Sequence, residues 1–190
     1  MRLFHLSDLH IGKRVNEFSM IEDQKYILER ILDLAEKEMP DGVILAGDIY
    51  DKQIPSAEAV QVFDEFITKL AEKKFPVFVI SGNHDSAERL AFGGRLLNSR
   101  GIYLSPVYDG TVMKIPIADQ YGTVWIHLLP FIRPAAVRRV FEDESDLITD
   151  VQSAVRAVIS HMEIDPNERN ILVAHQFVTG ASRCESEDIQ

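Results

Sequence analysis

The chain has 190 residues, of which 46% are hydrophobic and 26% are charged, and its formal net charge at pH 7 is −10. These values are typical of a globular domain and exclude a wholly disordered, collagen-like or coiled-coil chain. The single cysteine, Cys184, excludes a disulfide framework, a thiolate zinc site and an iron–sulfur cluster, and the acidic balance lacks the basic footprint of a simple nucleic-acid binder.

Strands and helices alternate along the first hundred residues. The expected elements are a strand at 3–6, a helix at 19–38, a strand at 43–46, a helix after Pro55, a strand at 77–80 and a helix at 86–98. Ser19 and Glu22 have capping-box spacing at the start of the first helix. The two later strands are apolar throughout, which is typical of strands buried on both faces of a sheet covered by helices. The alternation predicts a mostly parallel sheet.

The pattern changes after Gly101. Three strands joined by turns, one helix and a last strand are expected at 102–104, 111–117, 123–129, 146–162 and 171–174. Residues 1–180 are therefore expected to form one α/β domain with mostly parallel or mixed sheets, and 181–190 to form a polar tail that leads to a missing segment. The start of the chain does not fit a signal peptide, and no apolar run approaches the ~20 residues of a membrane helix. A cytoplasmic protein without a membrane partner is expected.

Polar side chains follow four of the predicted strands. Asp8 and His10 follow the first, Asp48 the second, Asn83 the third and His175 the last. Each of these could be an ordinary turn or cap residue. Ligands of parallel sheets bind beyond the carboxyl ends of the strands, however, so these side chains are expected to meet in one cluster. The repetition at the same end of four strands predicts a metal site.

The donor types favour a pair of divalent cations. Carboxylate, imidazole and amide oxygen suit Mn²⁺, Fe²⁺ or Zn²⁺ better than Mg²⁺, and Mn²⁺ is the ion expected first. A carboxylate at a central strand end, such as Asp48, can bridge two ions with its two oxygens. Paired ions of this kind clamp the attacking and leaving oxygens of a phosphoryl displacement.

The motifs Asp8-x-His10, Gly47-Asp48-x-x-Asp51 and Gly82-Asn83-His84-Asp85, followed by His175, resemble those of the calcineurin-like metallophosphoesterases. The resemblance implies the fold of that family, with helices flanking two sheets. It also implies a first ion held by the aspartate and histidine of the first motif, and a second held by the asparagine and the later histidine. The aspartate of the second motif would bridge the two ions.

The same resemblance assigns His84 to the leaving group, and the neighbouring Asp85 is expected to orient His84 by a hydrogen bond. The family's last motif, Gly-His-x-His, supplies one more ligand to each ion and has no match after His175. The chain is therefore expected to be an N-terminal fragment of a longer protein, with two incomplete metal sites, weak metal affinity and little activity alone.

The flanking residues are similar to the DNA-repair nucleases of this family, above all at 5–12 and at Leu129-Pro130-Phe131-Ile132-Arg133-Pro134. That similarity implies an exonuclease and endonuclease acting on DNA, an ATPase partner subunit and a homodimer of the full-length protein. A phosphoprotein phosphatase, a nucleotide phosphodiesterase and a non-catalytic scaffold remain alternatives. The arginines at 133, 138 and 139 would contact phosphate or a partner, or form a solvated face.

Overall fold

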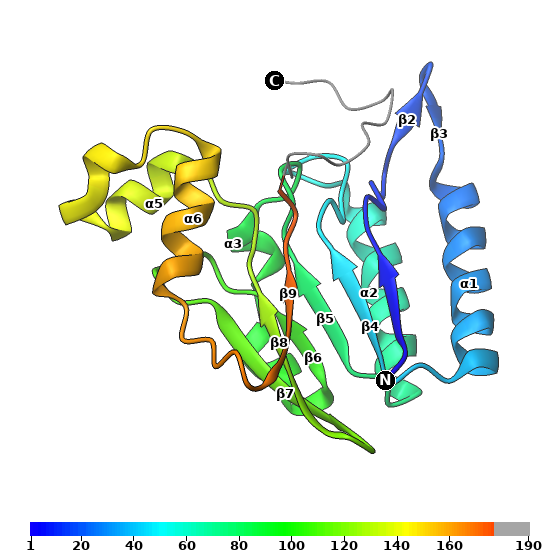
Figure 1. Ribbon diagram of the computed structural model, residues 1–190. Coiled ribbons are helices and arrows are strands. Elements are labelled where there is room, and N and C mark those ends of the chain that lie inside the picture. The colour runs from blue at the N-terminus through cyan, green and yellow to red at the C-terminus, as the bar shows by residue number, and fades with distance from the viewer. Residues whose placement is uncertain (177–190) are drawn as a thin grey trace.

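The computed structural model describes residues 1–176, and the tail predicted at 181–190 lies outside these residues. Two sheets pack face to face between helices (Figure 1). The helices and strands are, in chain order, β1 (Leu3–Leu6), β2 (Arg14–Val15), β3 (Phe18–Ser19), α1 (Ile21–Glu38), β4 (Gly42–Ala46), α2 (Ala57–Glu72), β5 (Val77–Ile80), α3 (Ala87–Leu90), α4 (Gly94–Leu97), β6 (Ile102–Leu104), β7 (Met113–Asp119), β8 (Gly122–Leu128), α5 (Pro134–Val140), α6 (Val151–His161) and β9 (Arg169–Val173).

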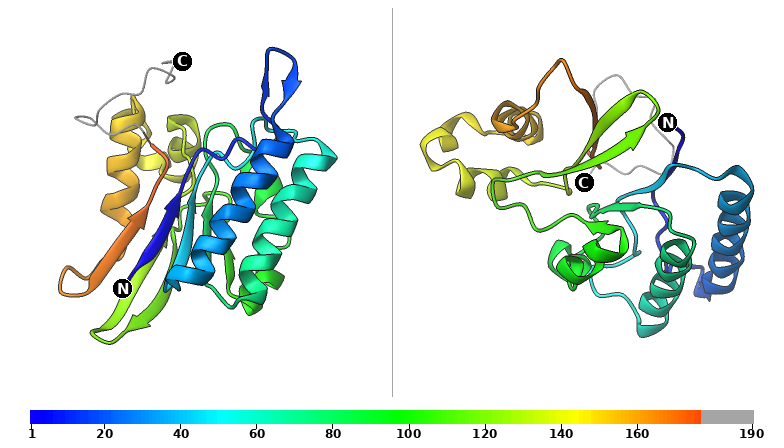
Figure 2. Two further views of the ribbon diagram at one scale, coloured as in Figure 1. Left: turned by 90° about the vertical axis from the view of Figure 1, so that its right-hand side faces the viewer. Right: turned by 90° about the horizontal axis from the view of Figure 1, so that it is seen from below.

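The first sheet is parallel throughout, with the strand order β1-β4-β5-β6. Helices α1 and α2 connect its first three strands and lie side by side on one face (Figure 2). All five residues of β4 and all four of β5 are buried. The predicted parallel sheet with two buried central strands is therefore confirmed.

The two faces of β4 contact different layers. Val43 and Leu45 pack with residues of α1 and α2, whereas Ile44 and Ala46 pack against the second sheet. That sheet has the order β7-β8-β9, with an antiparallel β7–β8 pair and a parallel β8–β9 pair. The predicted α/β fold, with parallel and mixed sheets flanked by helices, is confirmed: helices cover one face of β4 and the second sheet covers the other.

Three predicted helices differ from the structure, two at their start and one by a break in its middle. The capping box at Ser19 is wrong: α1 starts at Ile21 after Met20, without a side-chain cap, because Ser19 pairs with Arg14 in the β2–β3 hairpin. The helix predicted at 86–98 breaks into α3 and α4 at Gly93, whose φ is +75°. The helix predicted at 146–162 starts only after Asp150, which forms a capping box with Ser153.

Helices α5 and α6 pack together over a small cluster of their own, which also contains Leu129 and Ile132 from the loop after β8. This cluster fixes the loop that carries Pro130 and Arg133 near the carboxyl end of β5, where the amide of Phe131 donates to the carbonyl of Ser81 at 2.8 Å. Within residues 1–176, no helix is both long and apolar enough to cross a membrane.

Candidate metal centre

The loops that follow β1 and β4 continue the pairing of the two strands beyond the sheet. The amide of Asp8 donates to the carbonyl of Gly47 at 3.2 Å, and the amide of His10 donates to the carbonyl of Asp48 at 2.9 Å. A third bond joins the amide of Ile11 to the carbonyl of Ile49 at 2.9 Å. The predicted ligands on these two loops are therefore held together by the main chain.

Three predicted ligands have left-handed backbone conformations, with φ of +56° at Asp8, +43° at His10 and +49° at Asp48. Asparagine, aspartate and histidine accept this region more readily than other side chains, but each instance still carries strain. Such strain persists where the surrounding structure fixes it, and it concentrates at functional sites. Its occurrence three times in one cluster indicates that this backbone serves to aim side chains.

Two glycines allow the loops to approach one another closely. A Cβ on Gly47, whose φ is +89°, would lie 2.6 Å from the imidazole of His175. A Cβ on Gly82 would overlap the carboxylate and the amide of Asp48. The absence of a side chain at both positions therefore makes the space in which the predicted ligands converge.

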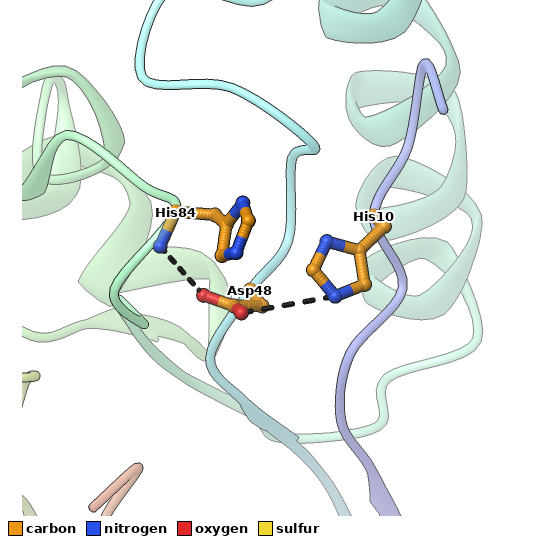
Figure 3. A group of neighbouring side chains, drawn as sticks. All are labelled: His10, Asp48 and His84. Carbon is orange, nitrogen blue, oxygen red and sulfur yellow. Dashed lines mark hydrogen bonds and ion pairs between the residues drawn. The ribbon is translucent and has the colours of Figure 1, made fainter. Parts of the chain in front are cut away.

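The ligand atoms fall into two groups that share Asp48. His10, Asp48 and His84 form one group and Asp8, Asp48 and His175 the other, with the atoms of each group within 4.8 Å of one another (Figure 3 shows the first). The Asp48 Oδ2 atom lies 3.7 Å from His10 Nε2 and 3.5 Å from His175 Nε2. A single buried carboxylate thus faces both imidazoles, as a bridging ligand must.

Asn83 completes the predicted set. Its Oδ1 atom lies 3.2 Å from His175 Nε2, while His175 Nδ1 lies 2.7 Å from the carbonyl oxygen of Ala46. The backbone carbonyl fixes a proton on Nδ1 and leaves Nε2 free to ligate, which is the usual arrangement for a metal-binding histidine. All five predicted ligands therefore meet at one place.

His84 stands at the exposed rim of this cluster. Its amide donates to Asp48 Oδ1 at 2.9 Å, and its Nδ1 atom lies 3.1 Å from the carbonyl oxygen of Asp51. The ring packs edge-on against His10, with centroids 4.9 Å apart. A proton held on Nδ1 by the Asp51 carbonyl leaves Nε2 available to a substrate.

Asp85 does not orient His84 by a direct hydrogen bond, so this expected role needs correction. Its carboxylate is buried and accepts from the amides of Gly82 at 2.9 Å, Ile49 at 3.1 Å and Tyr50 at 2.9 Å. These bonds join the loop after β5 to the loop after β4. Asp85 therefore fixes the positions of both loops, and through them the main chain beside His84.

Gln24 on α1 is a contributor that sequence reasoning missed. Its Nε2 atom donates to the carbonyls of Leu9 at 3.1 Å and His10 at 2.8 Å, and its Oε1 atom accepts from the amide of Gly12 at 2.9 Å. One side chain thus satisfies three main-chain groups of the loop that carries Asp8 and His10. The only sequence signal is an amide among the polar residues of a helix.

The cluster changes the titration of its members. Burial alone would raise the pKa of Asp48, but bonds to His175 and to the amide of His84 outweigh burial and lower it. Burial alone would lower the pKa of His175, but its bonds to Asp48 and to the Ala46 carbonyl raise it. Burial raises the pKa of Asp85 despite its three amide bonds. The imidazole and the shared carboxylate therefore attract each other strongly.

The residues present fit divalent cations. Two carboxylates, two imidazoles and one amide oxygen are the donors that Mn²⁺, Fe²⁺ and Zn²⁺ accept. His10 Nδ1 is buried without a hydrogen-bond partner among the described residues, and its nearest carboxylate oxygen is that of Asp51 at 3.9 Å. Asp51 thus lies next to the Nδ1 atoms of both His10 and His84. Its place in the second motif did not predict these contacts.

Comparisons with known proteins show the family to which the chain belongs. A family model described as calcineurin-like phosphoesterase matches residues 1–189. Proteins named as the SbcD component of the nuclease SbcCD, from Staphylococcus epidermidis and Staphylococcus saprophyticus, are each 35% identical to the chain over 190 residues, which cover 98% of the chain and 49% of the relative. The chain thus spans about half the length of these curated relatives.

A solved structure of Yfce, a phosphoesterase from E. coli, is also similar to the chain. It has a TM-score of 0.34 and 15% sequence identity, and the match covers 67% of this chain and 56% of that one.

Proposed function

Because this chain belongs to the calcineurin-like phosphoesterase family, we propose that it carries the active site of a metal-dependent DNA nuclease similar to SbcD. The reaction is exonuclease and endonuclease hydrolysis of phosphodiester bonds. The observation that carries the proposal is the convergence of two ligand groups on the single carboxylate of Asp48. The relatives are named as components of a nuclease, SbcCD, and this name supports DNA as the substrate.

As the family resemblance implies, Asp8, His10 and Asp48 would hold one ion, and Asp48, Asn83 and His175 the other, with Mn²⁺ as the preferred metal. The two groups found from the distances differ from these sets, because Asp8 falls with His175 and His84 with His10. Asp8 Oδ1 nevertheless lies 3.8 Å from His10 Nε2, and Asn83 Oδ1 lies 3.2 Å from His175 Nε2. When bound, such ions activate water and neutralise the charge of the phosphate. Asp48 would bridge, since its Oδ2 atom faces the imidazoles on both sides. Gly47 and Gly82 keep the space between these ligands open.

His84 would act on the leaving oxygen. Its Nδ1 atom is directed to the carbonyl of Asp51, and its side chain is exposed at the rim, where a phosphodiester can reach Nε2. A histidine in this place can donate a proton or a hydrogen bond to the departing alkoxide. Asp85 would keep the loop of His84 in register with the loop of Asp48 through its three amide bonds.

The proposal extends to partners. Phe92, just before α4, and Leu96, on it, are 86% and 80% exposed, and these two apolar side chains, close together in the chain, support a homodimer of the full-length protein. The relatives' name describes one component of a larger nuclease, which supports an SbcC-like ATPase as the second partner. Residues 1–180 would belong to the nuclease domain, and a cytoplasmic location fits the single cysteine.

The test uses the full-length protein with Mn²⁺ and linear duplex DNA, and an aryl phosphomonoester as a second substrate. Cleavage of DNA that is lost in His84→Gln, with Mn²⁺ binding retained, supports the proposal. His5→Gln is the matched control, because the side chain of His5 is exposed and makes no hydrogen bond within the described chain, while its main chain pairs in the β1–β4 ladder. Turnover of the monoester while DNA remains intact would mean a phosphatase and refute the nuclease.

A further inference from the structure

A pocket of about 300 Å³ opens beside the metal centre. Its walls come from the loop after β5, the loop after β6 and the loop after β8 with the start of α5. Asn83 lines the pocket and also belongs to the metal centre. The pocket therefore adjoins the place where a scissile phosphate would lie, and its volume is at the small end for ligand sites.

Two hydroxyl groups in the pocket wall lack partners. Ser81 is 2% exposed, and neither its Oγ atom nor the hydroxyl oxygen of Tyr108 has a hydrogen-bond partner among the described residues. Buried polar atoms are nearly always paired in folded proteins, so an unpaired one requires an explanation. Both oxygens have almost no accessible surface, so they lie behind the pocket surface and do not by themselves identify a ligand.

The remaining walls combine apolar surface with one free cation. Tyr108, Phe131 and Ile132 line the pocket; Ile132 is buried, and Tyr108 also packs against the cluster beneath α5 and α6. Arg133 is exposed and has no carboxylate within 4.0 Å in the described part of the chain. The charge of this guanidinium is thus available to a phosphate.

Two carboxylates also line the pocket, and both are engaged. Asp85 accepts from three amides, and Glu88 accepts from the hydroxyl of Ser86 at 2.9 Å at the exposed start of α3. Aromatic and guanidinium groups together match a nucleoside with a phosphate. Base–aromatic stacking accepts every base, so such a pocket would bind without sequence preference.

We propose that this pocket holds the nucleoside next to the scissile phosphate, with its base against Tyr108 and Phe131 and the following phosphate at Arg133. The proposal rests on the proposed nuclease function and extends it to the contact that distinguishes nucleic acid from other phosphoesters. The metal centre and Arg133 would then hold successive phosphates on either side of one base.

The test compares the binding of dTMP and deoxyribose 5-phosphate to the full-length protein in EDTA, by ligand-observed NMR titration. Both ligands carry the same phosphate, so the difference in affinity reports the base alone. Tyr108→Ala should weaken dTMP binding about tenfold, the loss typical of a stacking partner, and leave deoxyribose 5-phosphate unchanged. Arg133→Gln should weaken both ligands equally.

Two further variants keep the test decisive. Ala136→Phe fills the pocket from α5 without removing a contact, and should abolish the advantage of dTMP even if Tyr108→Ala does not fold. Arg139→Gln, on the same helix but outside the lining, should change neither affinity. Equal binding of both ligands to the wild type, or unchanged dTMP binding in Ala136→Phe, would refute the proposal that this pocket binds a nucleoside.

The outcomes for the pocket and for the proposed function are separate. Binding of dTMP is measured without metal, whereas the nuclease assay requires Mn²⁺ and DNA. If DNA stays intact while dTMP still binds more tightly than deoxyribose 5-phosphate, the proposed nuclease function is refuted and the proposed nucleoside binding stands. DNA that is cleaved while dTMP shows no advantage refutes the pocket alone.

Discussion

Replacing Gln24 by methionine tests whether α1 positions the first metal loop. The side chain makes three hydrogen bonds to this loop, of 2.8 Å, 2.9 Å and 3.1 Å. At about 1 kcal/mol each, with some hydration of the partly buried carbonyls, their loss destabilises the loop by about 2 kcal/mol. Metal binding must then restore the order of Asp8 and His10, so the Kd for Mn²⁺ should rise about 30-fold.

The measurement is a Mn²⁺ titration of the full-length protein, with hydrogen exchange of residues 8–13 as a readout that does not depend on metal. Faster exchange of this segment together with the weaker affinity is expected for Gln24→Met. Gln61→Met is the matched control, since Gln61 is exposed on α2 and makes no side-chain hydrogen bond within residues 1–176. An unchanged Kd in folded Gln24→Met would show that the loop holds its conformation without this side chain.

Three other substitutions probe the support of the site and of the second sheet. Gly47→Ala should lower the free energy of unfolding by clearly more than Gly101→Ala in urea titrations. Both glycines have positive φ, but a Cβ at Gly47 would lie 2.6 Å from His175, whereas a Cβ at Gly101 would meet no atom within 4 Å. Equal losses would refute the close approach of Gly47 to His175. Asp85→Ala leaves three buried amides without an acceptor and should lower the free energy of unfolding by about 3 kcal/mol in the same titration. A loss under about 1 kcal/mol would contradict the role of Asp85 in joining the two loops. The Arg169 guanidinium holds the pKa of Asp119 well below its usual range, so this carboxylate stabilises the fold above about pH 4 and the stability is lost as pH falls through the folded pKa. Asp119→Asn should therefore lower the Tm near neutral pH, and its Tm should fall less on acidification than that of the wild type. Curves of Tm against pH that run parallel for the two proteins would contradict this prediction.

The strand ends could be predicted because an apolar run changes abruptly to polar residues at each of them. Apolar runs such as 43–46 identify buried strands, and parallel strands bring their carboxyl ends to one edge. The structure accordingly brings Asp8, His10, Asp48, Asn83 and His175 together. The same apolar run did not reveal which layer covers each face, because a helix and a sheet bury Ile44 equally well.

Contacts between side chains and loops that are distant in the sequence could not be predicted from the sequence. Gln24 lies 14 positions from His10, and a glutamine on a helix has the pattern of a solvent-facing residue. Asp85 stands beside His84, which favours a direct pairing, but the turn directs its carboxylate back to the amides of Gly82, Ile49 and Tyr50. Ser19 had a capping pattern, and the β2–β3 hairpin competes for the same residue.

The main chain, more than the ligand side chains, holds this site in shape. Left-handed conformations at Asp8, His10 and Asp48 cost about 1 kcal/mol each or somewhat more. The three main-chain bonds between the loops after β1 and β4, with those of Gln24 and Asp85, offset a cost of this order. Because none of these bonds uses a ligand atom of Asp8 or His10, the loops keep their geometry when those side chains change. Substitution of Asp8 or His10 should then weaken metal binding without unfolding the chain, whereas substitution of Gln24 or Asp85 disturbs every ligand on the loop it holds.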